Sequence, residues 1–320
     1  MSGYIREQIG KLKSLFNSKT YTKEDCKIIH CSSPDVTQIL ANGIGNKKYR
    51  IATSGYSFEQ EGYRDTTLKF IRALDKELGS KSTGYITTPA LAEGSIYDIT
   101  TQVSGFGAKN VAYFTTDYFW ENTDFDSFRQ DVNMKKYSQT PIYMFPDTET
   151  YIKATANASN ILICTGGKTT AVSEVVEALK SKNRVILLIN ENLKDNDFDQ
   201  DKQIPNSAAM YFFKYVGKFQ KDLLSINELD LQYIRTHPGR INQLLRVYIV
   251  SDNKSIEAAA EHAANFLEGK SLYDFFPNKT DEIDASVSQM QKDNDIKTAY
   301  EHYEKNGELK FLFNEHKHFR

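Results

Sequence analysis

The sequence predicts an α/β protein of the Rossmann-like type: a mainly parallel sheet with helices on both faces, plus a helical C-terminal region. Between residues 27 and 190, short apolar runs of strand length alternate with amphipathic stretches of helix length. This alternation is typical of βαβ units, whose strands are buried on both faces. One apolar run also ends in two adjacent glycines, Gly166 and Gly167, directly before an amphipathic stretch.

The expected strands are apolar runs bounded by polar residues or glycines. They cover residues 27–31, 49–53, 85–88, 110–116, 142–145, 160–164, 184–190 and 247–250. The expected helices have apolar side chains at three- and four-residue spacing. They cover residues 67–78, 96–103, 149–156, 171–181 and 256–267. Gly79 and Gly269 follow two of these helices, where glycine C-caps are expected.

We expect three segments along the chain. Residues 1–24 form an N-terminal helix, because Ile5, Ile9, Leu12 and Phe16 lie on one helical stripe. Residues 25–205 form the Rossmann-like nucleotide-binding domain, and residues 206–320 form a mostly helical region. The polar stretch 192–203, followed by Pro205, is predicted to be a loop or linker.

The charge balance argues against two classes of partner. The 320 residues include 40 basic and 42 acidic side chains, which gives a net charge of −2. This near balance provides no electrostatic basis for binding duplex DNA or an anionic membrane surface, so we do not expect nucleic acid as a partner. No apolar run approaches the ~20 residues that a membrane helix needs, and we expect no membrane association.

The cysteines and histidines argue against disulfides and metals. Cys26, Cys31 and Cys164 are few and odd in number, and the polar N-terminus has no apolar signal core, which together predict a cytoplasmic protein. None of the six histidines has zinc-site spacing to a cysteine or acid pair. We therefore expect no metal and no cofactor.

The candidate site is the turn that follows the apolar run 160–164. It consists of Thr165, Gly166, Gly167, Lys168, Thr169 and Thr170. Glycines let a ligand approach the backbone closely, and a helix N-terminus supplies free N–H groups and partial positive charge for a phosphate. Thr169 and Thr170 can cap the helix or donate to phosphate, and Lys168 can add a cation. The alternative is that the glycines only form the bend.

A P-loop is not expected here. Its motif requires a glycine five residues before the Gly-Lys-Thr end, and Leu162 occupies that position inside a strand. The turn therefore predicts a nucleotide-like ligand without the P-loop arrangement.

The order of motifs resembles a known family. Ser54-Gly55-Tyr56 and Gly62-Tyr63 open the matched region, and the turn 165–170 and the strand 185–190 close it. These features resemble the lonely-guy family of lysine decarboxylase-like cytokinin phosphoribohydrolases, within the wider SMF/DprA–lonely-guy superfamily. The resemblance covers residues 49–190. Where the family has its catalytic glutamate this chain has Ser173, followed by Glu174, and the family's Arg-Lys pair aligns with Thr150 and Tyr151.

The resemblance implies hydrolysis of the N-glycosidic bond of a nucleotide. It implies Glu174 as the first candidate catalytic carboxylate and Glu177 as the second. The implied ligand-binding residues are Ser54, Gly55 and Tyr63, together with the turn residues Thr165, Gly166, Gly167, Lys168, Thr169 and Thr170. Glu59, Glu61 and Asp65 follow the same strand. The alternatives are a non-catalytic nucleotide-sensing module, a nucleoside deoxyribosyltransferase-like enzyme with a glutamate nucleophile, and a protein-interaction partner.

We also expect a homo-oligomer. The N-terminal stripe and the aromatic segment 211–219 provide apolar surface at helical spacing. The resemblance implies dimerisation through helices beside the site, and a closed two-fold assembly is the commonest oligomer.

Overall fold

The computed structural model describes most of the predicted α/β region. The described residues are 21–58, 62–89, 92–122, 130–167, 169–190, 194–196, 203–205 and 244–269. The stripe predicted near the N-terminus, the aromatic segment 211–219 and Lys168 lie outside these ranges.

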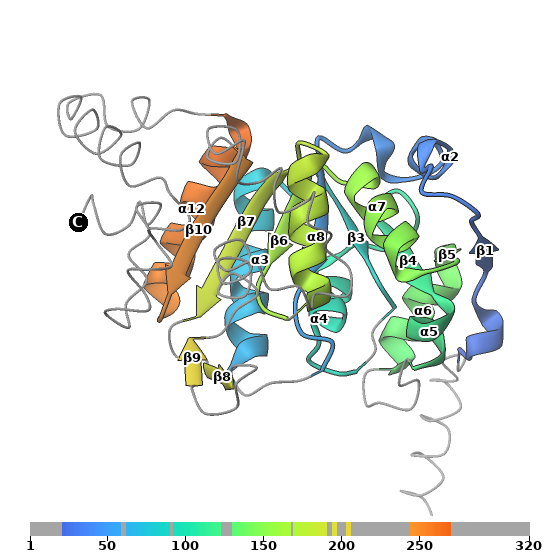
Figure 1. Cartoon of the computed structure of the whole chain (residues 1–320), viewed down its shortest axis with the longest axis horizontal. Helices are drawn as coiled ribbons and strands as arrows, with labels where there is room; N and C mark the ends of the chain where they lie inside the picture. Colours follow the sequence, from blue (N-terminus) through green and yellow to red (C-terminus); the bar gives the residue numbers. More distant parts are fainter. Residues whose placement is uncertain are drawn as a thin grey trace, which may run out of the picture.

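The centre of the structure is an eight-stranded sheet in the order β1-β5-β4-β3-β2-β6-β7-β10. Its strands are β1 (Ile28–His30), β2 (Tyr49–Ser54), β3 (Thr83–Thr87), β4 (Val111–Thr116), β5 (Ile142–Phe145), β6 (Ile161–Cys164), β7 (Arg184–Asn190) and β10 (Leu245–Val250). Every adjacent pair is parallel. The predicted fold class, a Rossmann-like α/β fold with a parallel sheet, is therefore confirmed (Figure 1).

Helices cover both faces of the sheet. They are α2 (Thr37–Ala41), α3 (Tyr63–Leu78), α4 (Ile96–Val103), α5 (Asp117–Glu121), α6 (Gln130–Gln139), α7 (Thr148–Ala158), α8 (Thr169–Lys180) and α12 (Asn253–Glu268), with the 3-10 turns η1 (Lys23–Asp25) and η2 (Ile44–Asn46). The apolar side chains of α2, α7 and α8 belong to one core cluster. Those of α3, α4, α6 and α12 belong to a second cluster.

The side chains of successive strand residues pack alternately in these two clusters. In β6, Ile161 and Ile163 pack in the second cluster, whereas Leu162 and Cys164 pack in the first. Side chains along a strand point alternately to opposite faces, so a strand buried on both faces presents apolar side chains to both. This arrangement explains why the strands were recognisable as continuous apolar runs.

The direction of winding reverses between β2 and β6. From β2 the chain proceeds through β3, β4 and β5 toward one edge of the sheet, and then returns to β6, β7 and β10 on the other side. The carboxyl ends of β2 and β6 lie side by side, with Ser54 paired to Cys164. In open α/β sheets, ligands bind in the crevice at such a reversal point.

Two details differ from the sequence-based expectation. The polar stretch predicted to be a loop contains β8 (Lys194–Asn196), which pairs in antiparallel fashion with β9 (Gln203–Pro205). In addition, β10 pairs with β7 over six residues, so the predicted domain end at residue 205 falls inside the span of the sheet. Spacing alone could predict β10 as a strand, but it could not identify the strand with which β10 pairs.

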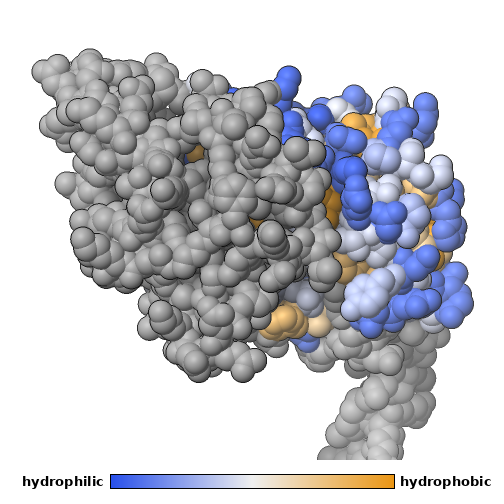
Figure 2. Space-filling model, viewed as in Figure 1, coloured by the Kyte–Doolittle hydropathy of each residue, from blue (hydrophilic) through white to orange (hydrophobic). Residues whose placement is uncertain are grey.

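The surface seen in Figure 2 is mainly hydrophilic over the described part of the chain, with small apolar patches separated from one another. Exposed large apolar side chains include Phe58, Phe106 and Tyr118. Among the described helices, none combines the length and the apolar character needed to cross a membrane.

Candidate functional site

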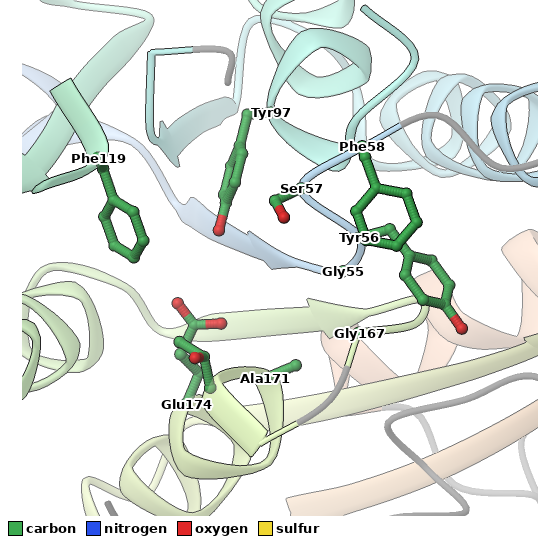
Figure 3. Close-up of a pocket in the computed structure, with 10 residues that line it drawn as sticks. Gly55, Tyr56, Ser57, Phe58, Tyr97, Phe119, Gly167, Ala171 and Glu174 are labelled. Carbon is green, nitrogen blue, oxygen red and sulfur yellow. The ribbon is translucent and has the colours of Figure 1, made fainter. Parts of the chain in front are cut away.

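A cavity of about 220 Å³ lies at the carboxyl ends of β2 and β6. Its lining consists of Gly55, Tyr56, Ser57, Phe58, Tyr97, Phe119, Gly167, Thr170, Ala171 and Glu174. These residues come from the loop after β2, the starts of α4 and α8, the short helix α5 and the turn after β6 (Figure 3). The cavity therefore occupies the crevice that the strand order predicts.

The turn after β2 depends on a glycine at residue 55. A Cβ atom built on Gly55 would lie 2.1 Å from the Tyr63 hydroxyl oxygen. That hydroxyl is buried and makes a 2.7 Å hydrogen bond with Thr165 Oγ1. Tyr63 and Thr165 therefore join the two turns from behind, and neither residue lines the cavity. Their place in the structure is to support the site rather than to face a ligand.

The turn after β6 depends on Gly167. Its φ of +90° lies in a region that L side chains rarely adopt, and a Cβ there would lie 2.8 Å from the Gly55 carbonyl oxygen. A Cβ on Gly166 would lie 2.5 Å from the Tyr56 ring. The two turns thus touch each other, and their glycines are required by close packing.

Glu174 is buried in α8, with 4% of its surface exposed. Ser54 at the end of β2 donates its hydroxyl hydrogen to Glu174 Oε2. The other oxygen, Oε1, has no hydrogen-bond partner among the described residues. Figure 3 shows the carboxylate pointing into the cavity, with Tyr97 on the opposite side. One oxygen is therefore anchored by Ser54, and the other is buried without a hydrogen-bond partner among the described residues.

Burial raises the pKa of Glu174 from 4.5 to about 7. The hydrogen bond from Ser54, and more weakly the neighbouring Tyr151 hydroxyl, act in the opposite direction and lower this pKa. Near neutral pH the carboxyl group is thus divided between its charged and neutral forms, which is the condition under which a side chain can both accept and return a proton.

The other titratable groups around Glu174 stay neutral in this range. Burial raises the pKa of Tyr97 and of Tyr151, and in both cases the Glu174 charge adds to the effect. Burial also raises the pKa of the Cys164 thiol to about 12. Cys164 is therefore an unreactive thiol inside the core, and Glu174 is the group in this cluster that titrates near neutrality.

Aromatic rings form the walls of the cavity. Figure 3 shows Phe119 on one side and Tyr56 and Phe58 on the other. The Phe58 ring is 52% exposed and contacts the Tyr56 ring at 5.5 Å between centroids. Tyr97 is the second residue of α4, and the backbone bond from Ile96 N to the Tyr56 carbonyl fixes the start of that helix beside the β2 loop.

These aromatic residues were missed as site residues by the sequence prediction. Ser57 and Phe58 shortly follow β2, and Phe119 shortly follows β4, so the rule that ligands bind beyond the carboxyl ends of parallel strands could have indicated them. Tyr97 had no comparable indication, because its helix reaches the cavity only through tertiary packing.

The remaining predicted residues are placed differently. Thr170 lines the cavity, and Ser54 reaches it through Glu174. Thr169 begins α8, and Lys168, Glu59 and Glu61 lie outside the described residues. Glu177 does not line the cavity and instead forms a 3.0 Å ion pair with Lys180. Asp65 is exposed in the first turn of α3. The structure therefore brings together Glu174 and the glycine turn but separates both from Glu177.

The site does not suggest a metal centre. In the part of the chain that the structure describes, no group of three or more His, Cys, Asp or Glu side chains is placed to hold a metal ion. The cavity combines one buried carboxylate, aromatic walls, hydroxyl groups and a helix start, which suits a small organic ligand that donates hydrogen bonds.

The comparisons with known proteins give little beyond the fold. No protein-family model matches the chain, and no curated protein matches it. Among solved structures, the chain is similar to DNA processing protein A from Helicobacter pylori, described for its single-stranded DNA binding mode. The identity is 10%, the match covers 48% of this chain and 68% of that one, and the TM-score is 0.31. At this identity and TM-score, the match assigns the chain to no family or superfamily.

This match corrects one sequence-based expectation. From the balanced charge we expected no nucleic-acid partner, whereas the matched protein is described as binding single-stranded DNA. The expectation was wrong as an exclusion, because net charge over a whole chain does not report a local binding surface. At this level of similarity the match concerns the fold, and it does not assign DNA binding to this chain.

Proposed function

We propose that the cavity binds a nucleotide-like ligand whose sugar hydroxyls face Glu174. The observation that carries the proposal is the buried carboxylate of Glu174, which lines a cavity between two glycine turns at the reversal point of the sheet and has one oxygen without a hydrogen-bond partner among the described residues. A buried carboxylate oxygen without a partner is costly to a protein, and a ligand hydroxyl would satisfy it.

The charges around the cavity support one orientation of the ligand. The described lining residues include one carboxylate and no lysine or arginine. A phosphate group beside Glu174 would bring two negative charges together in a desolvated place. The phosphate is better accommodated at the start of α8, because Gly167 carries no side chain and a helix N-terminus offers N–H groups and partial positive charge to an anion.

The aromatic walls suit a planar base. Phe58, Tyr56 and Phe119 present ring faces and edges to the cavity, and such rings hold flat heterocycles by stacking and by edge contacts. The base, sugar and phosphate of one nucleoside monophosphate thus correspond to three different parts of the site.

A second candidate function is cleavage of the N-glycosidic bond of that ligand. The specific observation in its favour is the Glu174 pKa of about 7, together with the place of Glu174 in the lining of the cavity. A carboxylate in this position can stabilise the positive charge that develops on the sugar during cleavage. The same oxygen suits the nucleophile of a deoxyribosyltransferase-like reaction, whereas a sensing module would use the carboxylate for binding alone.

Glu174→Gln is expected to lower any base release by about a hundredfold or more, because it removes the charge that stabilises the transition state. The assay incubates the chain with a panel of nucleoside monophosphates, measures free base by chromatography and measures binding by calorimetry. Glu177→Gln is the matched control, since it changes an acid on the same helix that lies outside the cavity, and it is expected to leave release unchanged.

The outcomes separate the candidates. Equal release by the parent and Glu174→Gln excludes a catalytic role for the carboxylate. Tight binding of a nucleoside monophosphate without release supports the sensing module. If calorimetry detects no binding of any member of the panel, the proposed function is wrong.

A further inference from the structure

The last two residues of β2 each bond to a helix that lines the cavity. Thr53 Oγ1 lies 2.8 Å from Thr100 Oγ1 in α4, and the Ser54 hydroxyl donates to Glu174 Oε2 in α8. Both strand residues are buried, with 3% and 1% of their surfaces exposed. Adjacent side chains of a strand point to opposite faces of the sheet. Thr53 therefore serves the face covered by α4, and Ser54 serves the face covered by α8.

The register of the sheet brings the Ser54 hydroxyl to Glu174. Ser54 pairs with Cys164 at the end of β6, and the Thr165 N–H donates to the Ser54 carbonyl oxygen at 3.0 Å. The turn after β6 leads into α8, where Glu174 lies in the second turn. Side chains of a helix lean toward its N-terminus, which for Glu174 is the direction of the cavity. The hydroxyl and the carboxylate therefore meet beside the cavity.

The carboxylate of Glu174 accepts a hydrogen bond from Ser54 at one oxygen. The other oxygen is buried without a partner among the described residues. Loss of the Ser54 hydroxyl would thus leave both oxygens unsatisfied in a buried place. This costs more free energy for a charged group than for a neutral one. The bond from Ser54 consequently stabilises the charged form more than the neutral form.

We propose that Ser54 is a positioning residue for the site: its hydroxyl holds one oxygen of Glu174, which fixes the carboxylate in the lining of the cavity and favours its charged form. The proposal rests on the proposed function in one respect, namely that Glu174 is the group that meets the ligand. Ser54 is not part of the cavity lining. It therefore acts through Glu174 and not on the ligand directly.

The strength of this contact depends on the charge of Glu174. A charged carboxylate only accepts, and a hydrogen bond to an ionised acceptor is about twice as strong as one between neutral groups. The Ser54 hydroxyl has one proton, which is directed to Glu174 Oε2. Protonation of the carboxylate weakens the contact, so removal of the hydroxyl should shift the equilibrium of Glu174 toward its neutral form.

The other titratable groups around Glu174 come from three elements. They are Tyr97 from α4, Cys164 from β6 and Tyr151 from α7. Burial raises the pKa of each of them, so none of the three carries charge near neutral pH. A change in the Glu174 titration on loss of the Ser54 hydroxyl therefore reports the hydroxyl itself and not the titration of one of these groups.

Ser54→Ala is expected to raise the midpoint of the Glu174 titration by about half a pH unit to one unit, because a donor to the charged form is lost. The measurement is an NMR titration of the ligand-free full chain carrying glutamate labelled with ¹³C at the side-chain carboxyl carbon. Glu174→Gln identifies the resonance. Thr53→Val is the matched control, because it removes a buried hydroxyl from the neighbouring residue that bonds to α4. The control is expected to keep the parent midpoint.

An unchanged Glu174 midpoint in a folded Ser54→Ala protein overturns the proposal, and so does an equal rise in Thr53→Val. Ser54→Cys takes the place of Ser54→Ala if the alanine variant does not fold. A thiol is a weaker donor than a hydroxyl, so the midpoint should again rise, by a smaller amount, and an unchanged midpoint would count against Ser54. The titration needs no ligand, so its result is distinguishable from a failure of nucleoside monophosphates to bind.

Discussion

Glu174→Gln is expected to stabilise the protein at pH 8 by about 3 kcal/mol while changing its stability little at pH 4.5. In the folded protein the pKa of Glu174 is raised from 4.5 to about 7. Below pH 4.5 the carboxyl group is protonated in both the folded and the unfolded chain. Between pH 4.5 and 7 the folded chain holds the proton more tightly, so the free energy of unfolding falls as pH rises through this window. Glutamine at this position stays neutral at every pH, so the variant does not lose stability in this window.

The measurement is urea unfolding of the parent and the variant at several pH values between 4.5 and 8. The difference between their free energies of unfolding should grow with pH and level off above about pH 7.5. Glu177→Gln is again the control and is expected to follow the parent, because Glu177 is ion-paired with Lys180 outside the cavity. If the free energies of unfolding of the parent and of Glu174→Gln change with pH in the same way, burial does not raise the pKa of Glu174.

Gly167→Ala is expected to destabilise the protein by several kcal/mol and to abolish binding of nucleoside monophosphates. A φ of +90° costs a residue with a side chain about 1–3 kcal/mol. The new methyl group would also lie 2.8 Å from the Gly55 carbonyl oxygen and 2.9 Å from Ala171 Cβ. The two turns would have to move apart, and both of them line the cavity.

Gly107→Ala separates these two costs. Gly107 has a similar φ of +81°, but an added Cβ there would meet nothing within 4 Å. Gly107→Ala should therefore lose only the stability that corresponds to the strained backbone, and it should keep full affinity for nucleoside monophosphates in calorimetry. If the two alanine variants lose the same stability and bind the same nucleoside monophosphate equally well, the contact between the turns does not matter for the site.

Strands with buried faces were the most predictable elements. The apolar runs at 142–145 and 184–190 match β5 and β7 residue for residue, because a strand buried on both faces needs an unbroken apolar run. The helices α2, α5 and α6 were not predicted. The first two have five residues each, and α6 has a sequence dominated by polar side chains. Such segments are fixed by their neighbours and have too little apolar periodicity to be recognised.

The candidate site was predictable in part, for a similar reason. The glycine turn and Glu174 are adjacent in sequence, and their chemistry can be read from one segment. The partners of Glu174 could not be read in this way. Ser54 lies 120 residues from it and Tyr151 belongs to a different helix, so only the parallel pairing of β2 with β6 and the packing of α7 on α8 bring them together.

The pairing of β2 with β6 also determines when the site can come into existence during synthesis. The residues that pair, such as Ile51 with Ile161, lie 110 positions apart in the chain. A ribosome adding about 5–20 residues per second takes roughly 5–20 s to cover that distance. Throughout this interval β2 can pair with β3 on one side only, and its other edge remains open to unwanted pairing. The binding site is thus a late product of folding, completed when β6 closes that edge.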